Sequence, residues 1–153
     1  MYPQGSLAVP GTVDALEARL KQVRPDSPRG WGRMTPQQML CHLADSFDVV
    51  TGDRPAKAVD TFVMRTVGKI VALRTPLPWP KGVPTGEAVD AEKGGTKPGD
   101  FERDRARTIA LLRRFVAPGT PRVNHPAFGA MSESDWARWG FGHVDHHLRQ
   151  FGL

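Results

Sequence analysis

The sequence predicts an all-α protein, a helical bundle of four principal helices. Apolar residues recur with helical spacing in four long stretches, and a capping residue stands where each stretch begins. No pair of alternating apolar segments is joined by a hairpin turn, so a sheet is not expected. A chain of 153 residues is within the usual size of one domain, and we expect residues 1–153 to form one.

Composition and hydropathy favour a folded protein without membrane segments. Hydrophobic residues make up 39% of the chain and charged residues 24%, as in ordinary globular proteins. The longest apolar runs are far shorter than the ~18 residues of a membrane span. Residues 1–10 have neither the basic start nor the apolar stretch of a secretory signal. The single cysteine, Cys41, cannot form an internal disulfide, and we expect a cytoplasmic protein.

The net charge of +5 raises the question of nucleic acid binding, but the cations form no continuous track. Their densest group is interrupted by Glu102 and Asp104, which is typical of the solvated face of a helix. This group consists of Arg103, Arg105, Arg107, Arg113 and Arg114. No zinc-finger spacing or aromatic RNA-binding motif accompanies it, so we expect no nucleic acid partner. Anionic small molecules match the charge equally well.

The first helix is predicted over residues 13–23. Val13, Leu16 and Leu20 recur at helical spacing, Thr12 is the expected cap, and Pro25 cannot continue the helix.

The second helix has the clearest start signal in the sequence. Thr35 and Gln38 match a capping box around Pro36, which is favoured in a first turn. One apolar stripe follows, made of Met39, Leu40, Leu43, Phe47 and Val50. Gly52 is expected to end this helix.

Two contrasting segments come next. Residues 59–73 favour a short extra helix, although their β-branched content leaves a strand open. Their apolar residues are Phe62, Val63, Val67, Ile70 and Val71. Thr75 to Gly99 contains five prolines and five glycines and is predicted to be a long loop. Such a loop is either a binding loop or lid, or a plain connector, and the sequence favours neither.

The last two helices are also predicted from their caps. Asp100 precedes a stretch whose apolar side carries Ile109, Leu111, Leu112, Phe115 and Val116, and Pro118 with Gly119 ends it. Ser132 precedes the last helix, and an acidic residue, Asp135, follows three residues later.

Two histidines of the last helix could converge on one metal ion, although the pair alone slightly favours hydrogen-bonded core residues. His143 and His147 are four residues apart, so on a helix they lie one above the other on the same face. Trp136, Gly140 and Phe151 share that face, which should therefore point into the bundle. Gly140 lacks a side chain one turn before His143 and is expected to leave space near the site.

His42 strengthens the prediction, because it lies mid-helix at the edge of the second helix's apolar stripe. Three histidines from two helices are a common way to bind a zinc-like ion with an open coordination position. The alternative is a set of hydrogen-bonded core residues, but buried imidazoles stabilise a core only when each finds a partner.

Other polar residues near these positions have plainer interpretations. Asp45 could orient an imidazole or bind metal, but a solvent-facing helix residue is the favoured interpretation. His125 is assigned to turn structure, with substrate contact near the metal as the alternative. His146 falls on a different face from its neighbours and is expected to be exposed. Cys41 is expected to be a small buried hydrophobe, neither nucleophile nor ligand.

Several short motifs together resemble a known family. WGRMT and MLCHL within residues 31–43, HPAFG at 125–129 and HVDHHLRQFG at 143–152 resemble the DinB-like superfamily in order and spacing. Within this superfamily the chain resembles a subgroup that has a His-Pro-x-Phe-Gly loop before the last helix. The resemblance implies a four-helix bundle with one long crossover. It also implies a metal held by one histidine of the second helix and two of the last, here His42, His143 and His147.

The resemblance also suggests an activity. Characterised relatives include metal-dependent transferases and isomerases that use thiols such as bacillithiol or mycothiol. It therefore implies a bacterial enzyme with one divalent ion, zinc or nickel, that transfers a low-molecular-weight thiol to an electrophilic small molecule. Two alternatives remain open: a metal-dependent hydrolase with water in the open position, and a non-catalytic, stress-related bundle that binds metal or ligand. A homodimer is a further open expectation.

Overall fold

The computed structural model describes residues 5–153, and within this range its regular elements are all helices, with no strand. Residues 1–4, part of the segment examined for a secretory signal, lie outside the described range. The α-helices are α1 (Thr12–Gln22), α2 (Pro36–Thr51), α3 (Lys69–Arg74), α4 (Phe101–Val116) and α5 (Glu133–Gln150). A π-helical turn, Met64–Gly68, precedes α3, and a 3-10 turn, Glu87–Val89, lies between α3 and α4.

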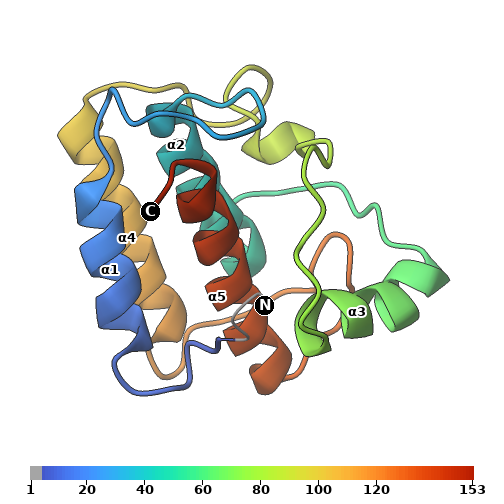
Figure 1. Ribbon diagram of the computed structural model, residues 1–153. Helices are drawn as coiled ribbons and strands as arrows, with labels where there is room; N and C mark the ends of the chain where they lie inside the picture. Colours follow the sequence, from blue (N-terminus) through green and yellow to red (C-terminus); the bar gives the residue numbers. More distant parts are fainter. Residues whose placement is uncertain (1–4) are drawn as a thin grey trace.

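The four long helices pack around one core, as Figure 1 shows. α4 lies against α1 and α2, and α5 closes the arrangement by packing against the same two helices, while α3 packs against α5 at the edge. Fully buried apolar side chains from all four long helices fill the interior. They include Leu16, Leu20, Leu40, Leu43, Phe47, Leu112, Phe115, Val144 and Leu148. Burial of such side chains supplies most of the helices' stability.

The N-caps predicted for α2, α4 and α5 are present in the structure. Thr35 and Gln38 form the capping box. The backbone N–H of Gln38 donates to Thr35 Oγ1 at 3.1 Å. Asp100 accepts from the amide of Arg103, and Ser132 from that of Asp135. Each cap satisfies a backbone N–H that the first helical turn leaves unpaired.

The predicted cap of the first helix is wrong. Thr12 is already the first helical residue, and the N-cap is Gly11, which has a φ of 82°. At the other end of α2, Gly52 ends the helix in the left-handed region, with a φ of 88°, as predicted.

The third stretch is helical, so the alternative of a strand is wrong. Helical structure runs without a break over residues 62–74. Most of its apolar residues nevertheless face outward: within this run only Leu73 is buried, while Met64 and Ala72 are partly buried against the core.

The loop over residues 75–99 is anchored to the helices. The amide and hydroxyl of Thr96 donate to the carboxylate of Asp45 at 2.6 and 2.7 Å. Arg54 donates to Gly94 O at 3.2 Å and pairs with Asp45. Gly95 folds back on Asp90, with its N–H donating to Asp90 O. These contacts hold residues 94–96, near the end of the loop, against α2 and the segment that follows it.

The arginine-rich run of α4 forms ion pairs with its neighbours. Arg107 pairs with Asp45 and Asp48 of α2, and Arg113 pairs with Asp14 and Glu17 of α1. These cations therefore connect α4 to the two helices beside it.

Gly140 allows a close approach between segments, and the prediction that it leaves space near the histidines is wrong. A Cβ at this position would lie 2.5 Å from Leu7 Cδ1 and 3.0 Å from Phe115 Cε1. The N-terminal segment and α4 fill the position where the side chain would be.

His125 organises the turn that leads into α5. Its Nδ1 accepts from the amides of Ala127 and Phe128, both at 3.1 Å, and its ring stacks on Phe128 with centroids 4.8 Å apart. Backbone hydrogen bonds between His125 and Gly129 close the turn. Burial lowers the pKa of His125 to about 4, so the ring is neutral and can accept.

In described residues 5–153, no helix is long and apolar enough to cross a membrane.

We predict that Gly95→Ala destabilises the protein by about 1–3 kcal/mol. The added Cβ would lie 2.8 Å from the carbonyl carbon and oxygen of Asp90, backbone atoms that cannot rotate away. Gly99→Ala is the matched control, because within residues 5–153 no atom outside Gly99 and its two chain neighbours lies within 4 Å of the new Cβ. Urea unfolding of both variants measures the difference. Equal midpoints would contradict the prediction.

A second prediction concerns acid stability. Because His125 has a pKa of about 4 when folded against 6.5 for the free side chain, the unfolded state binds more protons between these values. The contribution is complete above pH 6.5 and is lost as the pH falls towards 4; its size is up to about 3 kcal/mol. His125→Asn keeps a side-chain acceptor for the turn but cannot titrate. Its free energy of unfolding should therefore fall less between pH 7 and pH 4 than that of the parent protein. Parallel pH profiles would refute this.

Candidate metal centre

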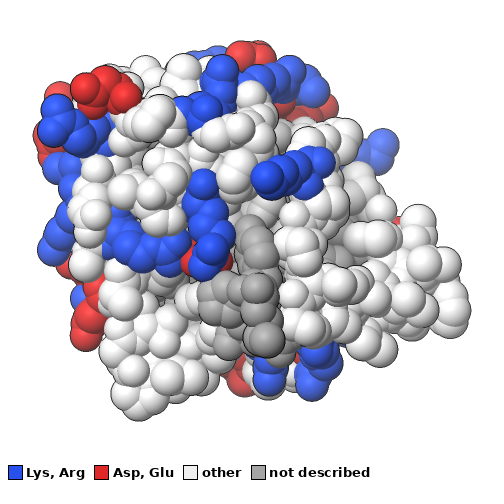
Figure 2. All heavy atoms as spheres, in the orientation of Figure 1, with Lys and Arg blue, Asp and Glu red and all other residues white. Residues whose placement is uncertain are grey.

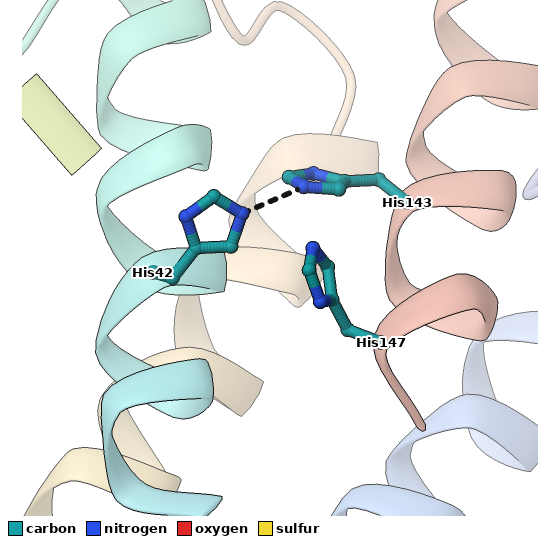
Figure 3. A group of neighbouring side chains, drawn as sticks. All are labelled: His42, His143 and His147. Atoms are coloured by element: carbon teal, nitrogen blue, oxygen red, sulfur yellow. Dashed lines mark hydrogen bonds between the residues drawn. The ribbon is translucent and has the colours of Figure 1, made fainter. Parts of the chain in front are cut away.

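Three histidine side chains meet between α2 and α5. His42 comes from α2, and His143 and His147 come from successive turns of α5 (Figure 3). One ring nitrogen from each lies within 4.8 Å of the other two, which is close enough to hold a metal ion. The Nε2 atoms of His42 and His143 are 3.0 Å apart. The sequence prediction that these three residues converge is therefore confirmed.

The position of each histidine along its helix determines where its ring lies. The capping box sets where α2 begins, and His42 then lies on the side of α2 that faces α5. His143 and His147 share a face of α5, and their ring centroids are 5.0 Å apart. The ring of His42 lies 5.1 Å from that of His143 and 4.7 Å from that of His147.

Hydrogen bonds fix the tautomers of two of the rings. His42 Nδ1 lies 3.0 Å from the carbonyl oxygen of Val89, which can only accept, so Nδ1 carries the proton and Nε2 a lone pair. His147 Nδ1 lies 3.1 Å from Gln150 Oε1, and Gln150 Nε2 donates to Trp31 O. His147 Nε2 therefore also carries a lone pair.

His143 differs from the other two. Its Nδ1 is buried and has no hydrogen-bond partner among the described residues. Its Nε2 faces the lone pair of His42 Nε2. Burying the unpaired Nδ1 is costly, and the lone pairs on His42 Nε2 and His147 Nε2 are positions that a metal ion could occupy.

The electrostatic environment keeps all three imidazoles neutral at pH 7. Burial is the main cause that lowers the pKa of His42, and it lowers the pKa of His143 and His147 to well below 6.5. The neighbouring histidines lower the last two further, because a second cation nearby would be repelled. The neutral imidazole is the form that binds a metal ion.

Aromatic side chains surround the cluster. Trp139 of α5 lies 5.1 Å from the ring of His143, and Trp79 lies 6.2 Å from it on another side. Trp79 is half-buried and comes from the loop over residues 75–99, so this loop covers the histidines.

The prediction that His146 is exposed is wrong. The residue is only 9% exposed, because Trp31 and Trp79 pack on its ring at 5.8 and 6.0 Å. It does not belong to the group that could hold an ion. Helical spacing correctly placed His146 on a different face of α5 from His143 and His147. Nothing in the local sequence indicates that Trp31 and Trp79 pack on that face.

Asp45 is neither solvent-facing, as the sequence favoured, nor bonded to an imidazole. It is 0% exposed, pairs with Arg54 and Arg107, and accepts two hydrogen bonds from Thr96. The partners that do orient the imidazoles are Val89 O and Gln150. Sequence reasoning missed both, although Gln150 lies one turn after His147 and spacing could have found it.

His125 and Cys41 lie outside the cluster. His125 borders a surface hollow that Gly52, Arg54 and Asn124 also line and that none of the three histidines reaches. Its role is in the turn, as the sequence favoured. Cys41 is 1% exposed, and burial together with Asp104 raises the pKa of its thiol to about 12. The thiol stays protonated, which fits a small buried hydrophobe.

Comparison with known proteins assigns the chain to a family. No curated protein and no solved structure matches it. One family's sequence profile matches residues 13–152, which include all four long helices apart from the first residue of α1, and all three histidines of the cluster. The chain belongs to this family, which is described as Protein of unknown function (DUF1569).

Proposed function

We propose that the protein is a metal-dependent enzyme that binds one divalent ion through His42, His143 and His147 and transfers a small thiol to an electrophile. The convergence of three neutral imidazoles on one point carries the proposal. We further propose that the fold is a DinB-like four-helix bundle in which residues 52–100 form the crossover. The packing of α1, α2, α4 and α5 around one core supports this.

The donor set suits a borderline divalent ion. Imidazole nitrogens favour zinc, nickel and copper over calcium or magnesium, which prefer oxygen ligands. In a tetrahedral zinc site two bound nitrogens are roughly 3.3 Å apart. Here His42 Nε2 and His143 Nε2 are 3.0 Å apart, and all three ligand nitrogens lie within 4.8 Å of one another. Small rotations of the side chains would be enough to accommodate the ion.

The composition of the group favours a catalytic site over a structural one. Structural zinc sites are closed by four protein ligands, whereas catalytic sites have three and leave a position open. Within residues 5–153 the group contains three histidines and no fourth ligand. We therefore propose zinc or nickel with one position open to substrate.

The chain's own residues would prepare this site for a thiol. Val89 O and Gln150 hold the rings of His42 and His147 with their lone pairs directed inward. Trp79 and Trp139 lie beside the ring of His143. A divalent ion held by neutral ligands keeps its full charge, which would favour the thiolate form of a bound thiol. Bacillithiol- or mycothiol-like compounds are the proposed thiols.

The metal proposal predicts a distinct pattern of occupancy. The purified protein should contain about one equivalent of zinc or nickel. His42→Ala, His143→Ala and His147→Ala should each lower the affinity by more than the roughly 10–100-fold that loss of an outer partner costs. Elemental analysis and calorimetric titration of the apo-protein provide the measurement.

His146→Ala and Cys41→Ala are the matched controls, since both residues are buried beside ligands but lie outside the group. Both should keep the ion. Loss of metal from His146→Ala together with retention by His147→Ala would show that the wrong histidines have been assigned.

The activity proposal predicts thiol transfer that depends on the metal. Metal-loaded protein should accelerate the reaction of a low-molecular-weight thiol with an electrophile such as an epoxide or aryl chloride. Removal of the ion should lower the rate by at least about 100-fold, because a metal supplies several kcal/mol of stabilisation. Circular dichroism should still report a folded protein, and adding the ion back should restore the rate.

Two results would contradict this proposal and support a different function. Ester or amide cleavage without any thiol would favour a metal-dependent hydrolase. A metal-free protein that unfolds, combined with loaded protein that is inert with every thiol, would favour a structural metal in a non-catalytic protein.

A further inference from the structure

The helical run over residues 62–74 has an apolar face that no other part of the described chain covers. We define the α3 face by five of its residues, whose exposed fractions range from 40% to 74%. They are Phe62, Val63, Val67, Ile70 and Val71. Val63, Val67 and Ile70 follow the i, i+4, i+7 spacing that a helix uses for a buried stripe. The stripe here faces away from the core.

The area of the α3 face matches what a dimer requires. With roughly 170–240 Å² of surface per whole residue, the exposed fractions amount to about 550 Å² of apolar surface. This is near the upper end of the ~300–600 Å² for the largest apolar patch on a monomer. Homodimer interfaces are about 65% apolar, so such a patch corresponds to about 800 Å² per partner, the standard interface size.

Charge distinguishes between the occupants that could cover this face. The cations of the same segment turn back onto the protein: Arg65 pairs with Asp60, Lys69 donates to Ala130 O, and Arg74 pairs with Asp135. Figure 2 shows the lobe formed by α3 nearly free of charged side chains on the side in view, while cations gather elsewhere. The positive charge of the chain is therefore directed away from this face.

We propose that the α3 face binds the α3 face of a second copy of this chain, forming a twofold-symmetric homodimer. Two copies of an uncharged apolar surface can meet without repulsion, despite the net charge of +5 on each chain. A membrane surface is the less suitable occupant, because helices that bind anionic lipid carry lysines and arginines beside their apolar face. A strongly acidic or basic partner would find no opposite charge here.

The dimer would also restrain a segment that few contacts hold. Leu73 is the single buried residue of the helical run, and hydrogen bonds from Lys69 and Arg74 supplement it. The indole of Trp79 donates to Ala72 O at 2.8 Å, so α3 is tied to the loop that covers the histidines.

The test is the mass of the full-length protein in solution over a range of concentrations. Analytical ultracentrifugation should find a dimer at micromolar concentrations. Val67→Glu should raise the dissociation constant by at least about tenfold, since it buries an unpaired charge at the interface. Val9→Glu is the matched control: Val9 is 56% exposed, Val67 is 60% exposed, and Val9 lies outside the α3 face. It should remain dimeric.

A cross-linking measurement keeps the test decisive if Val67→Glu folds poorly. Cys41 is buried, so a cysteine introduced at an exposed position is the reactive one. Val67→Cys should give a covalent dimer with a short bis-maleimide, and Val9→Cys should not. His143→Ala should cross-link like its parent in the Val67→Cys background, which separates failure of the dimer from failure of the metal site.

Three outcomes would overturn the proposal. One is a monomer at ~100 μM, well above the micromolar range expected. Another is equal dissociation of the Val9→Glu and Val67→Glu variants. The third is a monomer that binds vesicles of phosphatidylcholine and phosphatidylglycerol through Val67, which would assign the face to lipid.

Discussion

The carboxylate of Asp45 is buried where α2, α4 and the loop over residues 75–99 meet, and the course of that loop depends on it. A carboxylate removed from water is stable only when charged and hydrogen-bonding groups replace the water. Arg107 comes from α4, Arg54 from the segment after α2, and Thr96 from the loop itself. Removing one partner would leave the buried carboxylate incompletely paired. The loop is therefore held against α2 along one defined path.

That path completes the histidine cluster. The anchored loop brings Val89 O within 3.0 Å of His42 and lays Trp79 beside His143. One contact fixes a tautomer, and the other places an indole ring beside an imidazole. Helices α2 and α5 supply the imidazoles, but the loop decides which nitrogen of His42 carries the proton. A segment rich in proline and glycine thus contributes to the site through its backbone more than through its side chains.

The chain combines a well-packed centre with a flank that is held by few contacts. Around the histidines, α2 and α5 are supported by the shared core and by ion pairs with neighbouring helices, from Arg107 of α4 to Asp48 and from Arg19 of α1 to Asp145. The run over residues 62–74 has one buried residue and a broad apolar exterior. Both regions carry apolar residues at helical spacing. Such spacing indicates an apolar face but does not specify which segment covers that face.

The sequence by itself determined the helical class, most helix limits and the shared face of His143 and His147. These are local properties: a capping box acts within four residues, and the spacing of His143 and His147 fixes their common face. Only the tertiary structure decided that Asp45 and His146 are buried, that Leu7 occupies the space beside Gly140, and that the α3 face is exposed. Each of these depends on which distant segment packs against a residue, and helical spacing carries no information about that partner.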